Sequence, residues 1–572
     1  MQKFNVFYND IIIYVGTPHK RTLEDYFSRY GMTQLEMDVD ADFNTPLNKL
    51  VEMGFDLRGR PTIFYISNPF ELVANEYGDK PISGFSKWVE DNYSGKDTEM
   101  VQILEDIDYP IREEYLDFDL KNTCHRIGIE YEKFTVSRPQ LKIHYSRYYD
   151  ADSEAKVYSY YEDIISQFNF KVEQPKTLCS TAESALRTLT DATCQICCMN
   201  TQTIRDTDGR MFDVEKDDIE TIWNSASRME VVESLRNGVR HSSCQKCWDE
   251  EDAGLISKRM RDNRYNGIDT SERFDFPVNY EFNLGTVCNI KCRTCGPWSS
   301  SKWLDEYFNT GLAEIDKRRE DVPDFQKVIT GYSKKYKDDS KFWPEIRKHI
   351  SEVRHIDFYG GEPFLVKNQW KLLEYAIEKG YSDNISVHYN TNGTLWDKKK
   401  IEILDQFKKI KIDFSIDGIN DRFEYMRHPA KWKTVSSHLL DAVSKYHDDI
   451  AICHTISILN IFYVDEMLDW AEQNGVQIYL NLVHGPQWYN IKNIPESVKK
   501  VITDKLSNNV HNKMTGWFPL SGVLDFMNSV ECNQKHWEKF KLVTASVDHN
   551  RNENFKTVFP EFFEVIKQHG EW

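Results

Sequence analysis

Apolar runs of strand length alternate with helical patterns over the second half of the chain. Six such runs follow one another, each beginning at or just after one of the positions Val278, Ile356, Ile385, Ile410, Ile450 and Val476. Strands separated by helices favour a parallel sheet, because each helical crossover returns the chain to the same end of the sheet. Six repeats predict a partial (β/α)6 barrel over residues 276–495. Active sites of such barrels lie at the carboxyl ends of the strands.

The first hundred residues alternate in the same way on a smaller scale. The pattern predicts strands over 5–14, 34–39 and 61–65, and helices over 22–30 and 46–53. This order predicts a small α/β domain over residues 1–100. Residues 101–175 have no dominant period and are predicted to connect this domain to the rest. Residues 496–572 are predicted as a C-terminal helical region, and residues 302–348 as a long charged insertion in the barrel, a candidate lid.

Composition narrows the class of protein. The net charge of −19 argues against a broad phosphate-binding surface, so no nucleic-acid partner is expected. No apolar run is long enough to span a bilayer, and the start of the chain lacks a signal-like apolar core, so we expect no membrane association and a cytoplasmic location. Most of the twelve cysteines lie in local groups, which favours metal ligation over a disulfide framework.

Three cysteines directly after the first barrel strand form the pattern C-x3-C-x2-C, at Cys288, Cys292 and Cys295. Three thiolates on one loop can ligate three irons of a four-iron cluster and leave the fourth iron open to a ligand. Taken alone, the three cysteines are also compatible with a partial zinc site.

The next strands end in glycine and polar residues. Gly360 and Gly361 precede Glu362 at the end of one strand, where the glycines allow close backbone approach to a ligand and the carboxylate supplies an acceptor for an ammonium group. Later strands end with further polar positions, namely Asn390, Asn392, Ser415 and Asp417. At the carboxyl ends of adjacent parallel strands, these side chains are predicted to share one site.

The cysteine pattern and the strand ends together resemble the radical S-adenosylmethionine (radical SAM) enzymes. The resemblance implies that a 4Fe-4S cluster on Cys288, Cys292 and Cys295 binds S-adenosylmethionine (SAM), with Gly360, Gly361, Glu362, Asn390 and Asn392 as cofactor contacts. It further implies that Ser415 and Asp417 lie near the ribose, Arg427 near the SAM carboxylate, and Asn460 at a later SAM contact. Thr294 departs from the family, in which an aromatic residue often contacts adenine at that position.

A second group of cysteines precedes the barrel, within residues 176–275. The C-x2-C pair of Cys244 and Cys247 aims two sulfurs at one centre, and Cys179 and Cys197 are the predicted remaining ligands. Cys194 and Cys198 are alternatives. The region resembles the twitch or SPASM-type modules that hold an auxiliary iron-sulfur cluster, although Ala192 stands where those modules have glycine. A structural zinc ribbon is the competing interpretation, because spacing alone does not separate the two.

The N-terminal domain resembles a glutaredoxin, with Pro61 where that family has a cis-proline and Gly84 in its glycine-rich turn. Thr17 to Lys20 occupy the place of the redox cysteines, so thiol chemistry is excluded there. The resemblance implies a binding module without redox activity.

These resemblances together imply an enzyme that cleaves SAM reductively to a 5'-deoxyadenosyl radical, which abstracts hydrogen from a peptide or protein side chain. A flavodoxin or ferredoxin would supply the electron. The alternatives are a radical SAM enzyme acting on a small molecule or carbohydrate, and a non-catalytic iron-sulfur protein. Four further side chains on or beside barrel strands are candidate proton or hydrogen-atom donors, or else satisfied core residues: His388, Cys453, His454 and His484.

Overall fold

The computed structural model of the chain divides into two compact units. The first comprises residues 1–178 and 234–239, and the second comprises residues 179–233 and 240–572. The structure describes residues 5–8, 11–15, 62–66, 69–70, 73–74, 83, 85–93, 109–112, 119, 121–123, 126, 144–168, 171–172, 175–252, 256–265, 268, 273–316, 324–507 and 519–572.

The described part of the first unit contains a sheet in the order β1-β2-β3-β4. Strands β1 (Asn5–Tyr8) and β2 (Ile11–Val15) are antiparallel, and β3 (Thr62–Ile66) and β4 (Tyr109–Arg112) continue the sheet in parallel. The run over residues 5–14, predicted as one strand, is therefore two paired strands. Several predictions lie outside the described residues: the elements over 22–30, 34–39 and 46–53, and the positions Thr17 to Lys20, Pro61 and Gly84.

Aromatic packing joins the helices of the first unit. The helices are α4 (Phe85–Asn92), η3 (Tyr145–Tyr148), α7 (Ala151–Tyr160) and α8 (Glu162–Phe168). The ring centroid of Phe85 lies 5.4 Å from that of Tyr148 and 4.9 Å from that of Tyr149, which it meets edge to face. Edge-to-face pairs stabilise beyond their buried area. Part of the predicted connecting region thus packs against a helix of the predicted N-terminal domain.

A sheet in the order β12-β11-β10-β9-β8-β7-β5-β6 organises the second unit. The predicted barrel strands are β7 (Asn279–Asn283), β8 (His355–Tyr359), β9 (Ser386–Thr391), β10 (Lys409–Ser415), β11 (Ile450–Ile456) and β12 (Gln477–Leu482). Each pairs in parallel with the next. The α/β class, the parallel pairing and the six strand positions are confirmed.

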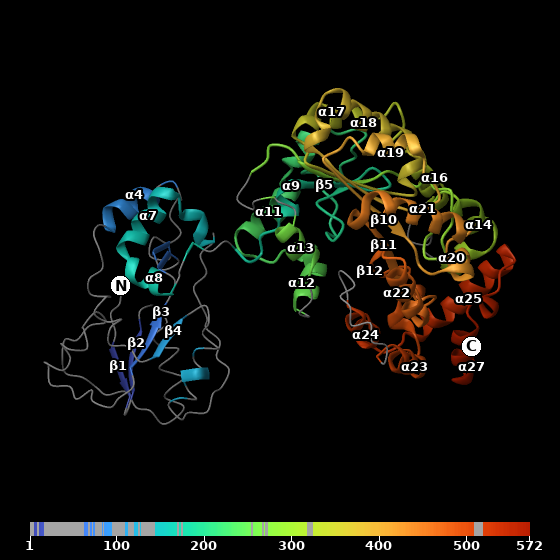
Figure 1. Ribbon diagram of the computed structural model, residues 1–572. Coiled ribbons are helices and arrows are strands. Elements are labelled where there is room, and N and C mark those ends of the chain that lie inside the picture. Colours follow the sequence, from blue (N-terminus) through green and yellow to red (C-terminus); the bar gives the residue numbers. More distant parts are fainter. Residues whose placement is uncertain are drawn as a thin grey trace. The chain divides into compact units, whose positions relative to one another are not determined.

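The two faces of these strands differ in polarity. On the outer face, the ring of Phe358 stacks on Tyr389 at 4.7 Å, and Trp370 stacks on Tyr389 at 5.9 Å. The covering helices are α18 (Lys367–Glu378), α19 (Lys398–Leu404), α21 (Trp432–Tyr446) and α22 (Val464–Gln473) (Figure 1). The inner face carries charged groups, among them Asp357 and Asp413. Alternation with period two produces both faces from the same strands.

The predicted auxiliary module contributes to the same sheet. Strand β5 (Ala185–Thr188) pairs in parallel with β7, with Ala185 opposite Asn279, and β6 (Cys194–Gln195) returns antiparallel along β5. The module also contains α9 (Ser180–Ser184), α10 (Ile219–Trp223), α11 (Ala226–Arg236), η4 (Ser242–Cys244), α12 (Gln245–Asp252) and α13 (Lys258–Tyr265). The module and the barrel therefore share one sheet, an arrangement that the sequence did not indicate.

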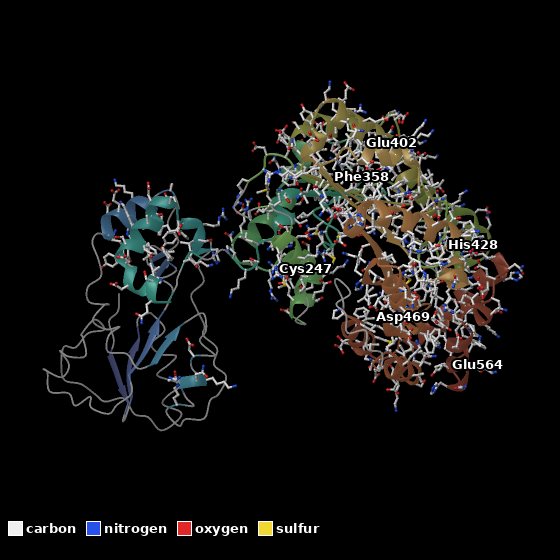
Figure 2. All side chains as sticks on the ribbon, in the orientation of Figure 1. Cys247, Phe358, Glu402, His428, Asp469 and Glu564 are labelled. Atoms are coloured by element: carbon white, nitrogen blue, oxygen red, sulfur yellow. The ribbon has the colours of Figure 1, made fainter. Side chains whose placement is uncertain are left out.

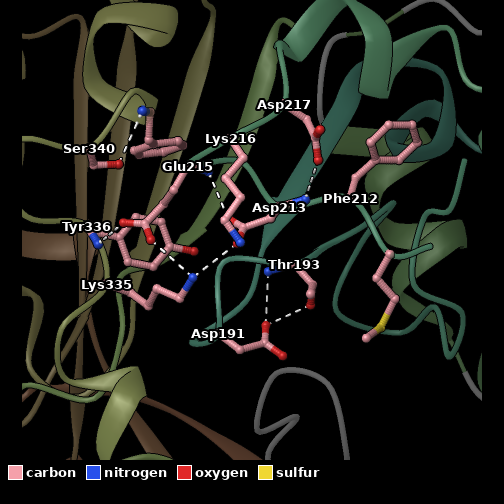
Figure 3. A network of polar contacts seen from close by, with 12 residues as sticks. Asp191, Thr193, Phe212, Asp213, Glu215, Lys216, Asp217, Lys335, Tyr336 and Ser340 are labelled. Atoms are coloured by element: carbon pink, nitrogen blue, oxygen red, sulfur yellow. Dashed lines mark hydrogen bonds and ion pairs between the residues drawn. The ribbon is translucent and has the colours of Figure 1, made fainter. Parts of the chain in front are cut away.

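The charged insertion is fixed to the loop that follows β6. It forms α14 (Trp303–Asn309), α15 (Leu312–Asp316), α16 (Phe325–Tyr332) and α17 (Phe342–His349). Between α16 and α17, Lys335 Nζ lies 3.1 Å from both Asp213 Oδ2 and Glu215 Oε2, and the backbone N–H of buried Tyr336 donates to Glu215 (Figure 3). These contacts hold the segment between α16 and α17 against the loop that follows β6, and the lid role of the insertion stays a prediction.

The C-terminal region forms α23 (Glu496–Ser507), α24 (Leu520–Asn528), α25 (Gln534–Arg551), α26 (Phe555–Val558) and α27 (Pro560–Gln568). Its buried aromatic side chains, including Trp537 and Phe540, join one apolar core with residues that follow β11 and β12, such as Tyr463 and Trp488. The region therefore packs on the barrel. Across the part of the chain that the structure describes, no helix has the length and apolar character needed to cross a membrane.

Candidate active site

The loop that follows β7 brings three thiols together. We call residues 284–298 the cysteine loop. The thiols of Cys292 and Cys295 are hydrogen-bonded to each other, and Cys288 interacts electrostatically with both. The bond from Cys295 lowers the pKa of Cys292 although burial opposes it, and burial raises the pKa of Cys288 to about 11. The predicted ligand set is thus gathered at the carboxyl end of β7.

The glycine pair after β8 packs against the cysteine loop itself. A Cβ on Gly361 would lie 2.3 Å from the carbonyl oxygen of Val287, a distance that real Cβ atoms do not reach. The N–H of Gly361 donates to the carbonyl of Gly285 at 3.1 Å, and the N–H of Glu362 donates to that of Val287 at 2.8 Å. The close backbone approach predicted for a ligand is therefore used to hold the loop.

Glu362 is fully buried and already accepts three hydrogen bonds within the protein. Oε1 accepts from the N–H of Phe364 at 3.0 Å and from Thr391 Oγ1 at 2.9 Å, and Oε2 accepts from the N–H of Asn392 at 2.8 Å. Burial raises the pKa of this carboxyl although these donors oppose the shift. A carboxylate has about four acceptor sites, so roughly one remains for the predicted ammonium group.

Asn392 connects this carboxylate to the cysteine loop. Its side-chain Nδ2 lies 2.9 Å from Asn289 Oδ1 and 3.9 Å from Cys288 Sγ, and its Oδ1 accepts from Thr394 Oγ1 at 2.6 Å. A donor directed at a sulfur stabilises negative charge there, and hydrogen bonds to the ligand sulfurs change the reduction potential of an iron-sulfur cluster. Asn392 is therefore positioned to act on the Cys288 thiolate.

Arg427 brings a buried cation to a second thiol. Its Nη1 lies 3.8 Å from Cys292 Sγ, and its Nη2 lies 2.9 Å from Asp417 Oδ2. Burial lowers the pKa of Arg427, but the charges of Asp417 and Cys292 outweigh it and raise the pKa. Within the described part of the chain, Arg427 Nε is buried without a hydrogen-bond partner. That donor fits the predicted role beside an anionic group, because unpaired buried N–H groups are rare.

The other predicted cofactor contacts lie at the same strand ends but differ in their partners. Asn390 on β9 and Ser415 at the end of β10 are half-buried. Asn460 is buried, and its Nδ2 donates to the carbonyls of Asp417 at 3.0 Å and Thr455 at 2.9 Å. Asn460 therefore ties the segment after β10 to the end of β11, while Asn390 and Ser415 remain partly accessible.

A buried ionic cluster that was not predicted from the sequence lies behind the cysteine loop. Arg293 is buried, and its Nη2 lies 2.6 Å from both Asp548 Oδ1 and Glu553 Oε2. Its guanidinium also lies 3.5 Å from the ring centroid of Tyr425, and Glu553 accepts from His428 Nδ1 at 2.7 Å. The only available signal was an arginine between two cysteines of a motif. The C-terminal helices thus hold the cysteine loop.

The four predicted auxiliary ligands also come together. Cys179 interacts electrostatically with Cys197, Cys244 and Cys247, and Cys244 interacts with Cys247. Burial raises the pKa of all four thiols. Cys198 interacts electrostatically with Cys197, and the two thiols share Glu281 and Lys258 as charged neighbours, so Cys198 remains an alternative ligand.

Cys194 lies apart from this group. It is fully buried on β6, and its Sγ lies 3.9 Å from the carbonyl oxygen of Phe212. Its charged neighbours are Asp191, Asp213 and Asp217, which belong to the polar network of Figure 3. In this environment Cys194 is a core residue, so the structure does not support it as an alternative ligand.

The donor sets can be tested against an iron-sulfur cluster. Among the described residues, no three His, Cys, Asp or Glu side chains converge as the ligands of one metal ion would. Ligands of a four-iron cluster bind different irons, so they need not converge on one point. Both thiol groups are chemically suited to a cluster, and they are separate: Figure 2 shows Cys247 of the auxiliary group apart from His428, which contacts the cysteine loop.

The four donor candidates on the strands have different surroundings. His388 lies between two carboxylates, and Cys453 contacts Tyr479. His454 is buried, its Nδ1 lies 2.8 Å from the carbonyl of Ile416, and burial lowers its pKa. Burial also lowers the pKa of His484, which meets Phe526 edge to face. His454 is therefore a packed core residue and His484 an exposed residue beside Phe526, whereas His388 and Cys453 belong to a polar inner surface.

The site thus combines three thiols and a buried guanidinium at the carboxyl ends of the strands of a parallel sheet. The family model that matches is the Radical SAM superfamily, over residues 282–473. Residues 282–473 are therefore a radical SAM domain, the kind of domain that holds a 4Fe-4S cluster and SAM. The match includes the cysteine loop, Glu362, Asp417 and Arg427.

Comparisons with individual proteins add less. No curated protein sequence matches the chain. Native anSMEcpe with bound AdoMet and Cp18Cys peptide shares 17% identity with a TM-score of 0.28, covering 40% of this chain and 58% of that one. Streptococcus suis SuiB bound to S-adenosylmethionine shares 11% identity with a TM-score of 0.27, covering 55% and 68%. At these values neither likeness bears on substrate or partners.

Proposed function

We propose that this enzyme uses SAM and the cluster on Cys288, Cys292 and Cys295 to oxidise a peptide or protein side chain. When bound, these two groups supply hydrogen-atom abstraction from a substrate. The contact of Arg427 with Cys292 and Asp417 carries the proposal, because it joins a buried cation with an unpaired N–H to a ligand thiol. A carboxylate placed against Arg427 would receive a charge-assisted hydrogen bond.

The other residues have supporting roles in this proposal. Gly360 and Gly361 fix the backbone of the cysteine loop, and Asn392 directs a donor at Cys288. Glu362 offers its remaining acceptor site to the SAM ammonium group. Ser415 and Asp417 are placed near the ribose, and Asn390 is a further, half-buried cofactor contact.

SAM cleavage is the first test. After anaerobic reconstitution with iron and sulfide, dithionite should produce 5'-deoxyadenosine from SAM. Replacing Cys288, Cys292 and Cys295 with Ala should abolish it, whereas Cys532→Ala, a cysteine on the C-terminal region whose Sγ meets the Asn493 carbonyl, should not. Full turnover in the triple variant would refute the assignment, and a cluster-loaded wild type without turnover would favour a non-catalytic iron-sulfur protein.

The substrate class rests on the auxiliary module, which is common in peptide-modifying radical SAM enzymes. Synthetic peptides should then increase 5'-deoxyadenosine formation above the substrate-free rate, and monosaccharides should not. An increase with monosaccharides or other small metabolites alone would favour the alternative class of substrate. The electron would come from a flavodoxin or ferredoxin, and replacing dithionite by such a protein with its reductase tests this partner.

The second thiol group is proposed to hold an auxiliary iron-sulfur cluster that accepts an electron from the substrate or anchors it. The mutual interactions of Cys179, Cys197, Cys244 and Cys247 support this role. The double change of Cys244 and Cys247 to Ala should remove about one cluster's worth of iron and stop product formation, while uncoupled SAM cleavage continues. About four irons with stoichiometric zinc in the wild type would instead indicate a zinc ribbon.

Residues 1–100 are proposed as a glutaredoxin-like binding domain without thiol chemistry. Deleting them should leave SAM cleavage intact and weaken the engagement of substrate or partner. Unchanged kinetics of the truncated protein on its true substrate would contradict the binding role.

A further inference from the structure

Five titratable side chains form a continuous chain across the inner face of the barrel sheet. Tyr479 OH donates to Asp413 Oδ2 at 2.7 Å, and the same oxygen lies 3.0 Å from His388 Nε2. On the other side of the imidazole, His388 Nδ1 lies 2.6 Å from Asp357 Oδ1, which lies 3.1 Å from His355 Nε2. The chain therefore links β12, β10, β9 and β8 through hydrogen-bonding contacts alone.

The two ends of this hydrogen-bonded series of side chains differ in solvent exposure. The side chain of His355 is 36% exposed, whereas that of Asp413 is 2% exposed and Tyr479 is buried. The Tyr479 hydroxyl is also hydrogen-bonded to the thiol of buried Cys453. The chain thus begins at solvent and ends inside the barrel at a thiol and a phenol.

The register of the strands permits this path. Tyr479 lies on β12 and Asp413 on β10, so the phenol has to reach across β11. The β11 residue opposite Asp413 is Ala451, which is buried with Cys453 and Tyr479 in one small cluster. A methyl group there leaves room for the phenol.

Charge along the chain is held in a fixed pattern. Burial lowers the pKa of His388, but the flanking carboxylates of Asp357 and Asp413 outweigh it and raise the pKa to about 9. The pKa values of both carboxyls are lowered despite their burial. Asp413 Oδ1 is buried without a hydrogen-bond partner among the described residues, with Lys411 Nζ at 3.9 Å. The ionised Asp413 carboxylate can therefore accept a proton on Oδ1.

The inner end of the chain adjoins the candidate cofactor site. Cys453 lies opposite Ser415 in the pairing of β11 with β10. It also interacts electrostatically with Asp417 and Arg427, the pair that reaches Cys292. A substrate held at the carboxyl ends of the strands would therefore meet this end of the chain.

We propose that the chain from His355 to Tyr479 and Cys453 is a proton path through which the substrate site exchanges one proton with solvent. The inference rests on the proposed function: an oxidation in which the 5'-deoxyadenosyl radical takes a hydrogen atom from the substrate, and the auxiliary cluster takes one further electron, must also release a proton. As the substrate X–H bond breaks, the proton goes to the phenol oxygen while the phenol proton moves to Asp413, and one proton leaves at His355. Apart from the substrate X–H bond, only O–H, N–H and S–H protons are exchanged, and no electron moves along the path.

Hydrogen-deuterium exchange of the Cys453 thiol tests the path without a substrate. The probe is D2O, added to the reconstituted full-length protein. The S–H infrared band of Cys453 is isolated by difference against Cys453→Ala. If the path exists, the band should be lost much faster in the wild type than in His388→Gln or Tyr479→Phe. In those variants, exchange has to wait for local opening of a buried region, so we expect it to be roughly tenfold slower or more.

Tyr389→Phe is the matched control, because it removes a buried hydroxyl from the outer face of β9, where it contacts Gln369. It should exchange like the wild type. Equal rates in the wild type and both path variants would overturn the proposal, as would equal slowing in Tyr389→Phe. If one path variant fails to fold, the other decides. SAM cleavage by the wild type is measured separately, so its failure would remove the proposed function without altering the exchange result.

Discussion

Replacing Arg293 with Met should loosen the cysteine loop without touching a thiol. The guanidinium is buried against Asp548 and Glu553, each at 2.6 Å, and donates to the carbonyl of Tyr425 at 3.1 Å. Removing one partner of a buried ion pair costs about 3–5 kcal/mol, because it leaves uncompensated charge. Both carboxylates are partly exposed, with 15% and 17% of their side-chain surface accessible, so we expect about 3 kcal/mol, the lower end of that range.

Amide hydrogen exchange over residues 286–300 measures this directly. A loss of about 3 kcal/mol in local stability corresponds to roughly a hundredfold faster exchange, at about 1.4 kcal/mol per factor of ten. Lys445→Met is the matched control, since its ion pair with Asp405 is exposed and worth about 0–1 kcal/mol. Adding Asp548→Asn and Glu553→Gln to Arg293→Met should recover part of the loss, because the buried charges are then removed. If Arg293→Met and Lys445→Met exchange equally, the reasoning fails.

Three further changes have defined outcomes. Gly361→Ala should reduce iron incorporation at the cysteine loop, because its Cβ would lie 2.3 Å from the Val287 carbonyl oxygen, whereas Gly331→Ala in α16 meets no atom within 4 Å and should not. The pKa of His388 is about 9 in the folded protein and 6.5 in the unfolded chain, so protonation of His388 stabilises the fold. This stabilisation is complete below pH 6.5 and is lost as the pH rises through 9. Urea midpoints should therefore fall between pH 6.5 and 9 in the wild type and fall less in His388→Gln; parallel curves would contradict this. Lys335→Met should increase proteolysis between α16 and α17 more than Lys216→Met, since both cations lie 3.1 Å from Asp213 Oδ2 but Lys216 is far more exposed; equal susceptibility would count against the buried network.

Local patterns predicted the elements of the barrel, and the structure confirms the positions of all six strands. They also predicted which cysteines gather, since Cys288, Cys292 and Cys295 lie on one loop and Cys244 and Cys247 on one turn. Period-two alternation and short-range spacing are properties of the local chain, so they can be recognised without the fold.

Contacts between distant segments could not be predicted in this way. Arg293 meets Asp548, and β5 joins β7, only because tertiary packing brings them together. From the sequence, we expected Gly361 to allow the close approach of a ligand, but in the structure it is the backbone of Val287 that lies close to it. A glycine pattern indicates that something approaches closely, but it does not say what approaches.

The pairing of β5 with β7 has a consequence for synthesis on the ribosome. Ala185 pairs with Asn279, so the first strand leaves the ribosome 94 residues before its partner (279 − 185). At about 5–20 residues per second, β5 waits roughly 5–20 seconds with that edge uncovered. A fragment that begins at residue 276 would have the opposite defect, because β7 would keep an open edge able to pair with another chain. Nascent chains stalled between these two strands should therefore be the ones that engage chaperones most strongly.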